Sequence, residues 1–533
     1  NRIEGVWLEE DYLRRYPYNS LACNVIGYTV SGNVGQYGIE QQYSSTLNGE
    51  NGRSYNFLNE DLEQDKTVRA AVDGDSVVST IDVTLQEIVE KAIDEFQEKY
   101  RDAAREGAGS KTAAAIMMDP NSGEILAMSS NRRYDLNNPY DVVANGLYSE
   151  EGAANLSEED RLKALNELWR NFCVSDTYEP GSTAKPITVA AALETGVVHD
   201  GDTFLCDGNQ TVGGHTIWCA KKIGHGVIDL EGSLKFSCND ALMQMSYRIG
   251  AENFTEYQQI FGFGQKTNID LPGESRTDSL IYTLDTTSQL SLATNAFGQN
   301  FNTTMIQLGT AFCSLVNGGK LYQPRVVSKI TDQNGNTIQD ISPTLLRETV
   351  SKTTSDTLKQ YMYSTVTSGT GNTAKVDGYS MGGKTGTAQK VPRDGVNYLV
   401  SFIGFAPVDD PQLMIYCFVD EPNSQDQPHS TFAQNIVREI LEEVLPYMNI
   451  YPDEETTGLH SGWDITGTDT GAAAVTDRVT GNMENISEEE PEGTDDVPDT
   501  MEDIPGAEEN NEENAENDGV NAEEAGTTSD NSE

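Results

Sequence analysis

The chain has 533 residues, of which 37% are hydrophobic and 23% are charged, and its formal net charge is −50 at pH 7. This length exceeds that of one typical domain, so we expect a folded core with attached segments. An acidic chain without clusters of Lys and Arg excludes nucleic acid as a partner, because binding to phosphates needs concentrated positive charge.

The first 75 residues are rich in Gly, Asn, Tyr and Ser, a composition that predicts short strands and loops. They begin with neither Met nor a signal peptide, so we expect the chain to be a piece cut from a longer protein. Apolar runs such as Leu413 to Val419 have strand length and fall short of the roughly 18 residues that span a bilayer. We therefore expect the native N-terminal anchor to be absent from this chain.

A folded core is predicted to follow this segment. Apolar residues from Leu85 to Phe96 recur at helical spacing, with Asp82 or Thr84 as the possible helix cap. Residues 113–128 contain two apolar runs that are separated by turn residues, a pattern typical of a hairpin. The core is therefore expected to start with a helix and two paired strands.

The predicted secondary structure of the rest of the core changes from helices to strands and then to a final helix. Helical patterns dominate from about 155 to 317, and strand-like runs return at 320–327 and 398–419. Residues 436–444 predict a closing helix against the sheet. Strands at the start, helices in the middle and strands at the end predict an α+β domain whose sheet is completed by the far ends of the chain. We place this domain at residues 76–450.

The negative charge is concentrated at the C-terminal end. Residues from Pro452 to Glu533 include 26 Asp or Glu and one Arg, about half of the net charge of the whole chain. Because this segment has few aromatic or branched apolar residues to bury, we predict a disordered acidic tail over 451–533. A segment that binds cations or a partner is one interpretation, but we favour a solvated spacer.

Seven cysteines are scattered along the chain without paired C-x-x-C spacing, which argues against a zinc site. We expect no metal and no cofactor. Cys206 and Cys219 flank the pair Gly213-Gly214, so a hairpin could bring the two thiols together. Outside the cytoplasm they either form a disulfide or remain free, and the sequence leaves both alternatives open.

The first motif with chemical meaning is the only Ser-x-x-Lys of the chain, which runs from Ser182 to Lys185. Pro186 and the apolar run after it predict a helix that starts close to Ser182. The helix N-terminus favours negative charge near the Ser182 hydroxyl, and Lys185 lies one turn further on the same face. A nucleophile and a base would then be neighbours. The alternative is an ordinary helix start with a solvated lysine.

Two further motifs indicate a function only when they are considered together with the Ser-x-x-Lys motif. Ser237-Cys238-Asn239 precedes another predicted helix, and alone it is explained by a helix cap. Residues 382–387 contain the only Lys-Thr-Gly, and on an extended strand Thr385 and Thr387 face one side while Lys384 faces the other. The glycines leave room for an extended peptide to add as a strand. The alternative is a Gly-rich edge strand with an exposed lysine.

The order Ser-x-x-Lys, Ser-x-Asn and Lys-Thr-Gly is typical of penicillin-binding proteins and related β-lactamases. Over residues 76–450 the chain resembles the monofunctional, class B penicillin-binding proteins, and Gly38-Ile39-Glu40 with the strands before it resembles the end of their non-catalytic pedestal domain, here 1–75. The resemblance implies the penicillin-binding transpeptidase fold, an α+β fold with an antiparallel sheet, flanking helices and a helical subdomain. The further similar stretches are Glu179–Thr183, Gly224–Gly226, Gly298-Gln299, Asn317–Gly319 and Gly369–Gly371.

The resemblance also implies a peptidoglycan D,D-transpeptidase whose catalytic residues are Ser182, Lys185, Ser237 and Lys384. Ser182 would attack the penultimate D-Ala carbonyl, Lys185 would take its proton, and Ser237 would relay a proton to the departing D-Ala. Lys384 would hold positive charge near Lys185 and depress the pKa of that lysine. The amides of Ser182 and Thr387 would form the oxyanion hole. Substrate binding is assigned to Asn239, Thr385, Gly386 and Thr387.

Other functions fit parts of the same pattern. A serine β-lactamase or β-lactam sensor shares the first and third motifs, a D,D-carboxypeptidase uses water in place of the acceptor amine, and a catalytically inactive relative would be a wall-binding scaffold. The mechanism requires none of the five histidines, and His225 is expected in a loop. The implied partners are peptidoglycan stem peptides or their lipid-linked precursor, β-lactams and a polytopic membrane glycosyltransferase, at the extracytoplasmic face of the cell membrane.

Overall fold

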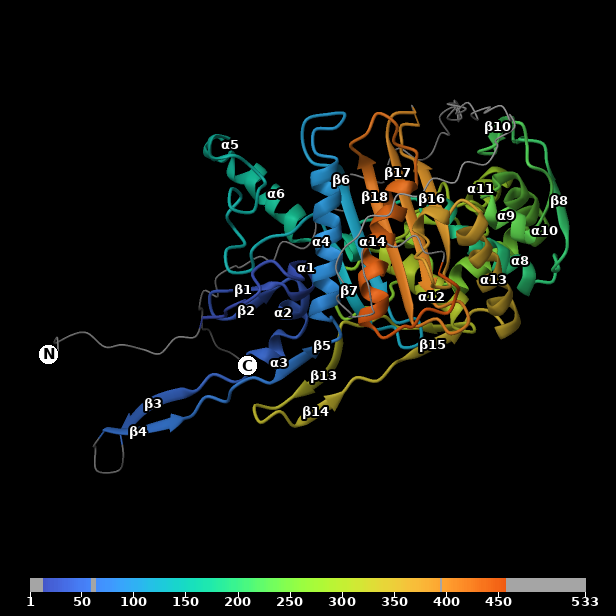
Figure 1. Ribbon diagram of the computed structural model, residues 1–533. Coiled ribbons are helices and arrows are strands. Elements are labelled where there is room, and N and C mark those ends of the chain that lie inside the picture. The colour runs from blue at the N-terminus through green and yellow to red at the C-terminus, as the bar shows by residue number, and fades with distance from the viewer. Residues whose placement is uncertain (1–12, 59–63, 394, 457–533) are drawn as a thin grey trace, which may run out of the picture.

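The computed structural model describes residues 13–58, 64–393 and 395–456. Most of the acidic tail predicted over 451–533 lies outside the described residues. The centre is a five-stranded antiparallel sheet with the strand order β16-β17-β18-β6-β7 (Figure 1). The strands are β6 (Ser110–Met118), β7 (Ile125–Ser130), β16 (Gly382–Gln389), β17 (Tyr398–Ala406) and β18 (Leu413–Pro422).

Both faces of this sheet are covered. Helices α4 (Val83–Lys99) and α14 (Thr431–Tyr447) lie side by side on one face (Figure 1). Along β6, alternate residues starting at Ala113 pack with these two helices, while those starting at Ala114 pack on the helical subdomain. The predicted hairpin, the predicted strands at 398–419 and the closing helix are therefore confirmed. Asp82 caps α4, because its carboxylate accepts the amides of residues 84 and 85.

A helical subdomain packs on the other face, with α8 and α10 in contact and α12 against β6 and β18. It provides the segments that carry the first two motifs. Its helices are α7 (Phe172–Ser175), α8 (Lys185–Glu194), α9 (Leu230–Lys235), α10 (Asn239–Ile260), α11 (Gln289–Asn295), α12 (Met305–Val316) and α13 (Lys352–Ser368), with the 3-10 turns η1 (Gly181–Ala184) and η2 (Asp278–Leu280). Helices α5 (Glu150–Ala154) and α6 (Glu158–Trp169) lie apart from it (Figure 1), and α6 packs on the N-terminal residues. The turn η3 (Asn372–Ala374) packs on α14.

Four short strands interrupt the stretch that the sequence predicts as helical. They form two antiparallel pairs, β8 with β11 and β9 with β10. Gly213 and Gly214 link β9 to β10 with φ of 58° and 87°, which is the backbone of a tight hairpin turn. The predicted hairpin is therefore confirmed, and the helical prediction is wrong here because the short strands lack a long periodic pattern. Their bounds are β8 (Thr203–Cys206), β9 (Asn209–Val212), β10 (His215–Trp218) and β11 (Gly226–Asp229).

Smaller elements connect the N-terminal residues to the core. Strand β5 pairs with β13, and the hairpin of β3 and β4 extends away from the rest (Figure 1). The predicted short strands and loops are accompanied by three short helices. None of the described helices is both long and apolar enough to cross a membrane. The bounds are α1 (Cys23–Ile26), β1 (Tyr28–Val30), β2 (Val34–Gln36), α2 (Gly38–Gln42), α3 (Ser44–Leu47), β3 (Arg53–Leu58), β4 (Gln64–Arg69), β5 (Ser76–Ser79), β12 (Lys320–Tyr322), β13 (Val327–Thr331), β14 (Thr337–Asp340) and β15 (Leu345–Glu348).

Candidate active site

Ser182 lies in turn η1, directly before α8. The predicted helix start is confirmed, and Pro186 occupies the first turn of the helix, where an amide hydrogen is not needed. The Thr183 hydroxyl donates to the Pro180 carbonyl at 2.6 Å and closes the turn. Ser182 is partly exposed, whereas Lys185 is completely buried. The hydroxyl is therefore accessible to a substrate while the lysine is shielded from water.

The Lys185 ammonium is held by the Ser-x-Asn segment. Its Nζ donates to the Ser237 carbonyl at 2.6 Å, to Ser237 Oγ at 3.1 Å and to Asn239 Oδ1 at 2.7 Å. No hydrogen bond joins Lys185 to Ser182 within the described part of the chain. Because α8 and α10 pack against each other, the first two motifs meet although Lys185 and Ser237 are 52 positions apart. The solvated-lysine alternative is wrong, since Lys185 is fully buried.

The Lys-Thr-Gly strand reaches the same point from the sheet. Lys384 is fully buried on β16, and its Nζ donates to Ser237 Oγ at 2.9 Å. Ser237 Oγ thus accepts from two lysines, and its own proton is left to be donated elsewhere. The alternative of an exposed lysine is wrong for Lys384 as well. Ser237 is the polar centre on which all three motifs converge.

Burial controls the protonation of both lysines. It lowers the pKa of Lys185 from its ordinary value to about 8, and the nearby thiols of Cys219 and Cys238 oppose this shift. Burial, and after it the charge on Lys185, lower the pKa of Lys384 well below its usual range. The family resemblance implies that the Lys384 charge depresses the pKa of Lys185. In the structure the largest cause is burial, and the repulsion between the two lysines lowers the pKa of Lys384.

The substrate-binding residues predicted on β16 lie on the edge of the sheet, next to η1. Thr385 is buried and its hydroxyl is 3.0 Å from the Thr370 hydroxyl, whereas Thr387 is exposed. Gly386 lets the strand approach the turn, because a Cβ there would lie 3.0 Å from Thr183 Cγ2 in η1, and 2.3 Å from Ser401 Oγ on β17. Strand β16 is paired with a strand on one side only, and recognition of an extended peptide uses such an unpaired edge.

Two residues that support the active site, Thr370 and Arg393, were not identified from the sequence. Thr370 belongs to a family-like stretch, but nothing in that stretch alone assigned it a role. Arg393 forms an ion pair with Glu179, with Nη2 at 2.9 and 3.0 Å from the carboxylate oxygens, and Glu179 also accepts the Asn300 amide at 2.8 Å. These contacts fix the chain three residues before Ser182. Glu179 and Arg393 are 214 positions apart, so no local pattern could connect them.

Gly298 lies directly against the turn that carries Ser182. Its φ is 87°, its carbonyl accepts the Gly181 amide at 2.9 Å, and a Cβ at this position would lie 1.9 Å from the Gly181 carbonyl oxygen. Any side chain there must displace η1. Because a shift of about 1 Å in a reacting group can cost on the order of 10²-fold in rate, this contact is expected to matter for chemistry.

We expect Gly298→Ala to lower the rate of acylation by penicillin about 10- to 100-fold. Gly318→Ala is the matched control, because Gly318 has a φ of 86° and only one distant side-chain atom near its Cβ position, at 4.0 Å. Both variants carry the same left-handed backbone strain, roughly 1–2 kcal/mol. The acylation rates of the two variants are compared by stopped-flow kinetics, and their unfolding temperatures are compared by thermal unfolding. Equal acylation rates in the two variants would contradict the role of Gly298.

Cys206 and Cys219 are free in the structure, so their disulfide, one of the two alternatives left open by the sequence, is not formed. With Cys238 and His225 they make a group of four side chains whose ligand atoms lie within 4.8 Å of one another. His225 lies in the loop before β11, as expected. This group is the one place among the described residues where a metal ion could be held.

Comparisons with known proteins agree with this geometry. Residues 113–442 match the family model for the penicillin-binding protein transpeptidase domain, and residues 1–79 match that for the penicillin-binding protein dimerisation domain. Stage V sporulation protein D of Bacillus subtilis is 36% identical over 479 residues, which cover 87% of this chain and 69% of the relative. The peptidoglycan D,D-transpeptidase FtsI homolog of Mesostigma viride is 29% identical, with coverages of 86% and 76%.

Solved structures show the same similarity. Penicillin-binding protein 3 of Mycobacterium tuberculosis matches with a TM-score of 0.69 and 27% identity, over 83% of this chain and 92% of that one. Structures of the same mycobacterial protein with aztreonam and with ampicillin match with TM-scores of 0.69 and 0.68, at 26% identity and with coverages of 83% of this chain and 92% and 91% of those chains.

Proposed function

Because the chain belongs to the penicillin-binding transpeptidase family, and is a serine-type peptidoglycan D,D-transpeptidase, we propose that Ser182 carries the acyl group during cross-linking. The observation that supports this assignment is the convergence of Lys185 and Lys384 on Ser237, beside an accessible Ser182 at a helix start. Such a set combines a nucleophile, a base with a lowered pKa and a proton relay, which are the parts that acyl transfer needs.

In the first stage, Ser182 Oγ attacks the carbonyl carbon of the penultimate D-Ala of a stem peptide. The Ser182 proton passes to neutral Lys185 Nζ, while the amides of Ser182 and Thr387 stabilise the oxyanion, a contribution of about 2.7–4 kcal/mol per donor in enzymes of this kind. The bond from that carbonyl to the nitrogen of the terminal D-Ala then breaks. Ser237 delivers a proton from Lys185 to the leaving amine, and an ester on Ser182 remains.

In the second stage, an amine of a neighbouring stem peptide attacks the ester carbonyl. Its proton returns through the same lysine and serine, the bond from the carbonyl to Ser182 Oγ breaks, and Ser182 regains its hydrogen. The product is the cross-link. A β-lactam enters the first stage in the same way but leaves an ester that is slow to react further, so we expect covalent inhibition.

The strand edge explains how the donor peptide is held. An extended stem peptide lies along β16, with Asn239 contacting its amide and with Thr385, Gly386 and Thr387 at its terminal carboxylate. Buried Thr385 is positioned by the Thr370 hydroxyl, and Lys384 lies beside it. The positive charge available from these lysines favours a carboxylate at this end of the site.

The cellular setting follows from the same assignment. We propose that the protein acts at the extracytoplasmic face of the cell membrane, where stem peptides and their lipid-linked precursor are present. A polytopic membrane glycosyltransferase is the expected partner, since cross-linking requires newly polymerised glycan. The domain limits we propose are 1–75 for the pedestal segment, 76–450 for the transpeptidase domain and 451–533 for the acidic tail.

Product analysis tests the reaction. The full chain is incubated with a synthetic stem pentapeptide ending in D-Ala-D-Ala and an amine acceptor, and the products are identified by mass spectrometry. We expect release of D-Ala and a peptide joined to the acceptor, with neither formed by Ser182→Ala. A tetrapeptide alone would indicate a carboxypeptidase, and rapid turnover of penicillin without an adduct would indicate a β-lactamase.

A further inference from the structure

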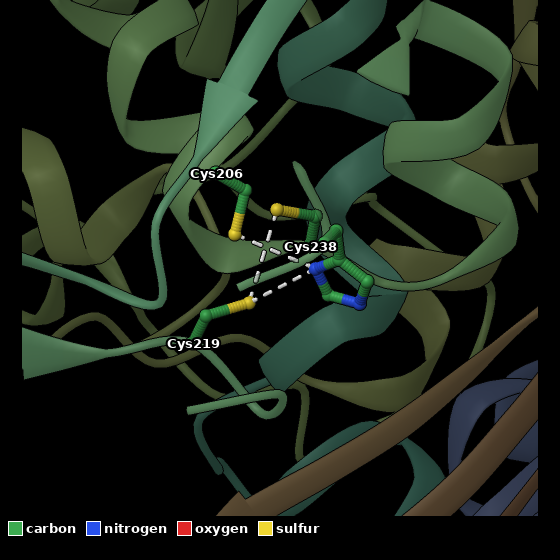
Figure 2. A group of neighbouring side chains, drawn as sticks. Cys206, Cys219 and Cys238 are labelled. Atoms are coloured by element: carbon green, nitrogen blue, oxygen red, sulfur yellow. Dashed lines mark hydrogen bonds between the residues drawn. The ribbon is translucent and has the colours of Figure 1, made fainter. Parts of the chain in front are cut away.

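Four potential metal ligands converge beside the active site from separate segments of the chain. Cys206 ends β8, Cys219 follows β10, His225 precedes β11, and Cys238 is the N-cap of α10. Figure 2 shows the sulfur atoms of the three cysteines pointing toward one another. All three cysteines are buried and His225 is partly buried. The cluster lies outside the mechanism described above, which uses none of its members.

Three of the distances within the cluster match tetrahedral coordination. His225 Nδ1 lies 3.5 Å from Cys206 Sγ and 3.6 Å from Cys219 Sγ, and the Sγ atoms of Cys219 and Cys238 are 3.8 Å apart. Zinc bonds of about 2.3 Å to sulfur and 2.0–2.1 Å to nitrogen, at tetrahedral angles, place two sulfurs about 3.8 Å apart and a sulfur and a nitrogen about 3.6 Å apart. Both separations are those observed.

The chemistry of the four groups selects zinc. Three thiolates and one imidazole are the ligand set of closed, structural zinc sites, and they fit the hard, oxygen-preferring ions Mg²⁺ and Ca²⁺ poorly. The His225 ring is stacked on Phe236, an arrangement that holds its nitrogen toward the sulfurs.

Two simpler interpretations account for less of the cluster. Buried cysteines are common as small apolar residues, but that interpretation gives no reason for an imidazole nitrogen at contact distance from two sulfurs. A disulfide between Cys219 and Cys238 would need their sulfurs to move from 3.8 Å to about 2.05 Å apart, and it would leave Cys206 and His225 without a role.

We propose that Cys206, Cys219, His225 Nδ1 and Cys238 bind one Zn²⁺ ion, which holds Ser237 and Asn239 in place. The proposal that zinc binds here is independent of the proposed function. The proposal that zinc positions Ser237 and Asn239 for catalysis rests on the proposed function. Cys238 lies between these two residues, so a metal bond to its sulfur fixes the backbone on both sides.

The local backbone shows why such a restraint is useful. Ser237 has a φ of 54°, in the left-handed region that a residue with a side chain adopts only at an energetic cost. Asn239 Nδ2 donates to the Trp218 carbonyl at 3.2 Å, one residue before Cys219. The strand pairs that bring three of the ligands are each two-stranded, and such pairs are marginally stable without further support. A metal ion joins them to α10.

Metal content is the primary test. The full chain, purified under reducing conditions and reconstituted with Zn²⁺, is expected to hold one zinc per chain by elemental mass spectrometry. Cys219→Ser and His225→Ala are expected to reduce this value at least fivefold. Cys313→Ser is the matched control, because Cys313 is also buried and free but lies on α12 outside the cluster, and it is expected to retain the metal.

A second measurement uses only the wild-type protein, so it remains valid if the variants do not fold. Wild-type protein treated with a chelator and titrated with Zn²⁺ is expected to gain several degrees in unfolding temperature, and X-ray absorption is expected to show three sulfur ligands and one nitrogen ligand. Zinc present equally in all variants, no zinc in folded wild type, or a mass lower by two hydrogens with the Cys219 and Cys238 peptides linked would each overturn the proposal.

The positioning role has its own measurement. In the zinc-depleted wild type, the acylation rate with penicillin is expected to fall at least tenfold and to recover when Zn²⁺ is added back. Stoichiometric zinc without any effect on acylation would overturn the positioning role and leave the metal site. A protein that binds zinc but never forms a penicillin adduct would contradict the proposed function and not the metal site.

Discussion

Replacing Ser182 by alanine is expected to remove transpeptidase activity, with a loss of about a millionfold, close to the limit of detection. Ser182 provides the oxygen that bonds to the acyl carbon. Ser237 is also partly exposed and near a helix start, but its Oγ is held by hydrogen bonds from both Lys185 and Lys384. Loss of a serine nucleophile in an enzyme of this type costs on the order of 10⁶ in kcat. Binding of the donor peptide is expected to persist, because the contacts on β16 are retained.

The measurement is cross-link formation, followed by liquid chromatography with mass spectrometry, in wild type, Ser182→Ala and Ser368→Ala. Ser368 is the control, since it is exposed at the end of α13, and that variant is expected to match wild type. Unfolding temperatures within a few degrees of wild type show that each variant is folded. Residual turnover in Ser182→Ala above about a thousandth of the wild-type rate would contradict the assignment of Ser182 as the nucleophile.

Replacing Lys185 by methionine is expected to lower the acylation rate by about 10²- to 10⁴-fold, the usual contribution of a general base. The change removes the group that takes the Ser182 proton and also frees Ser237 and Asn239 from their shared partner. Methionine is apolar and of similar length, so it fits the buried position without placing an unpaired charge there. Lys352→Met, on an exposed lysine of α13, is the control.

The pH profile separates a base from a purely structural lysine. Because burial lowers the pKa of Lys185 to about 8, its base form increases tenfold per pH unit below that value and then saturates. The wild-type acylation rate is therefore expected to rise with pH and level off above about 8. Lys185→Met is expected to lose this inflection. The same inflection in both proteins would contradict the role of Lys185 as the base.

The chemistry of the site could be predicted from the sequence because it is carried by short motifs. Ser182 and Lys185 are separated by one helical turn, and the proline and apolar run beside them predict the helix that orients both. The three motifs could be placed in one site only through the family resemblance, since nothing local shows that Ser237 Oγ lies 2.9 Å from Lys384 Nζ. The hairpin at 113–128 was predictable for the same local reason, as a turn between two apolar runs.

Features that depend on distant partners could not be predicted. The ion pair of Glu179 and Arg393 joins segments 214 positions apart. The cysteines and histidine of the cluster are spread over residues 206–238 and meet only when the two strand pairs form, so their spacing in the sequence could not show that they are neighbours. Burial of Lys185 and Lys384, which sets their pKa values, likewise follows from the packing of α8 on α10 and of β16 on η1 and α13, and not from any local pattern.

The central claim is that Ser182 carries the acyl group, and it is tested most directly by locating the adduct. Wild-type protein is incubated with penicillin, its intact mass is measured, and a protease digest is sequenced by tandem mass spectrometry. The account predicts one penicillin per chain, attached to Ser182 in the peptide that also contains Thr183 and Lys185. An adduct on another residue, or folded protein that forms no adduct, would contradict it.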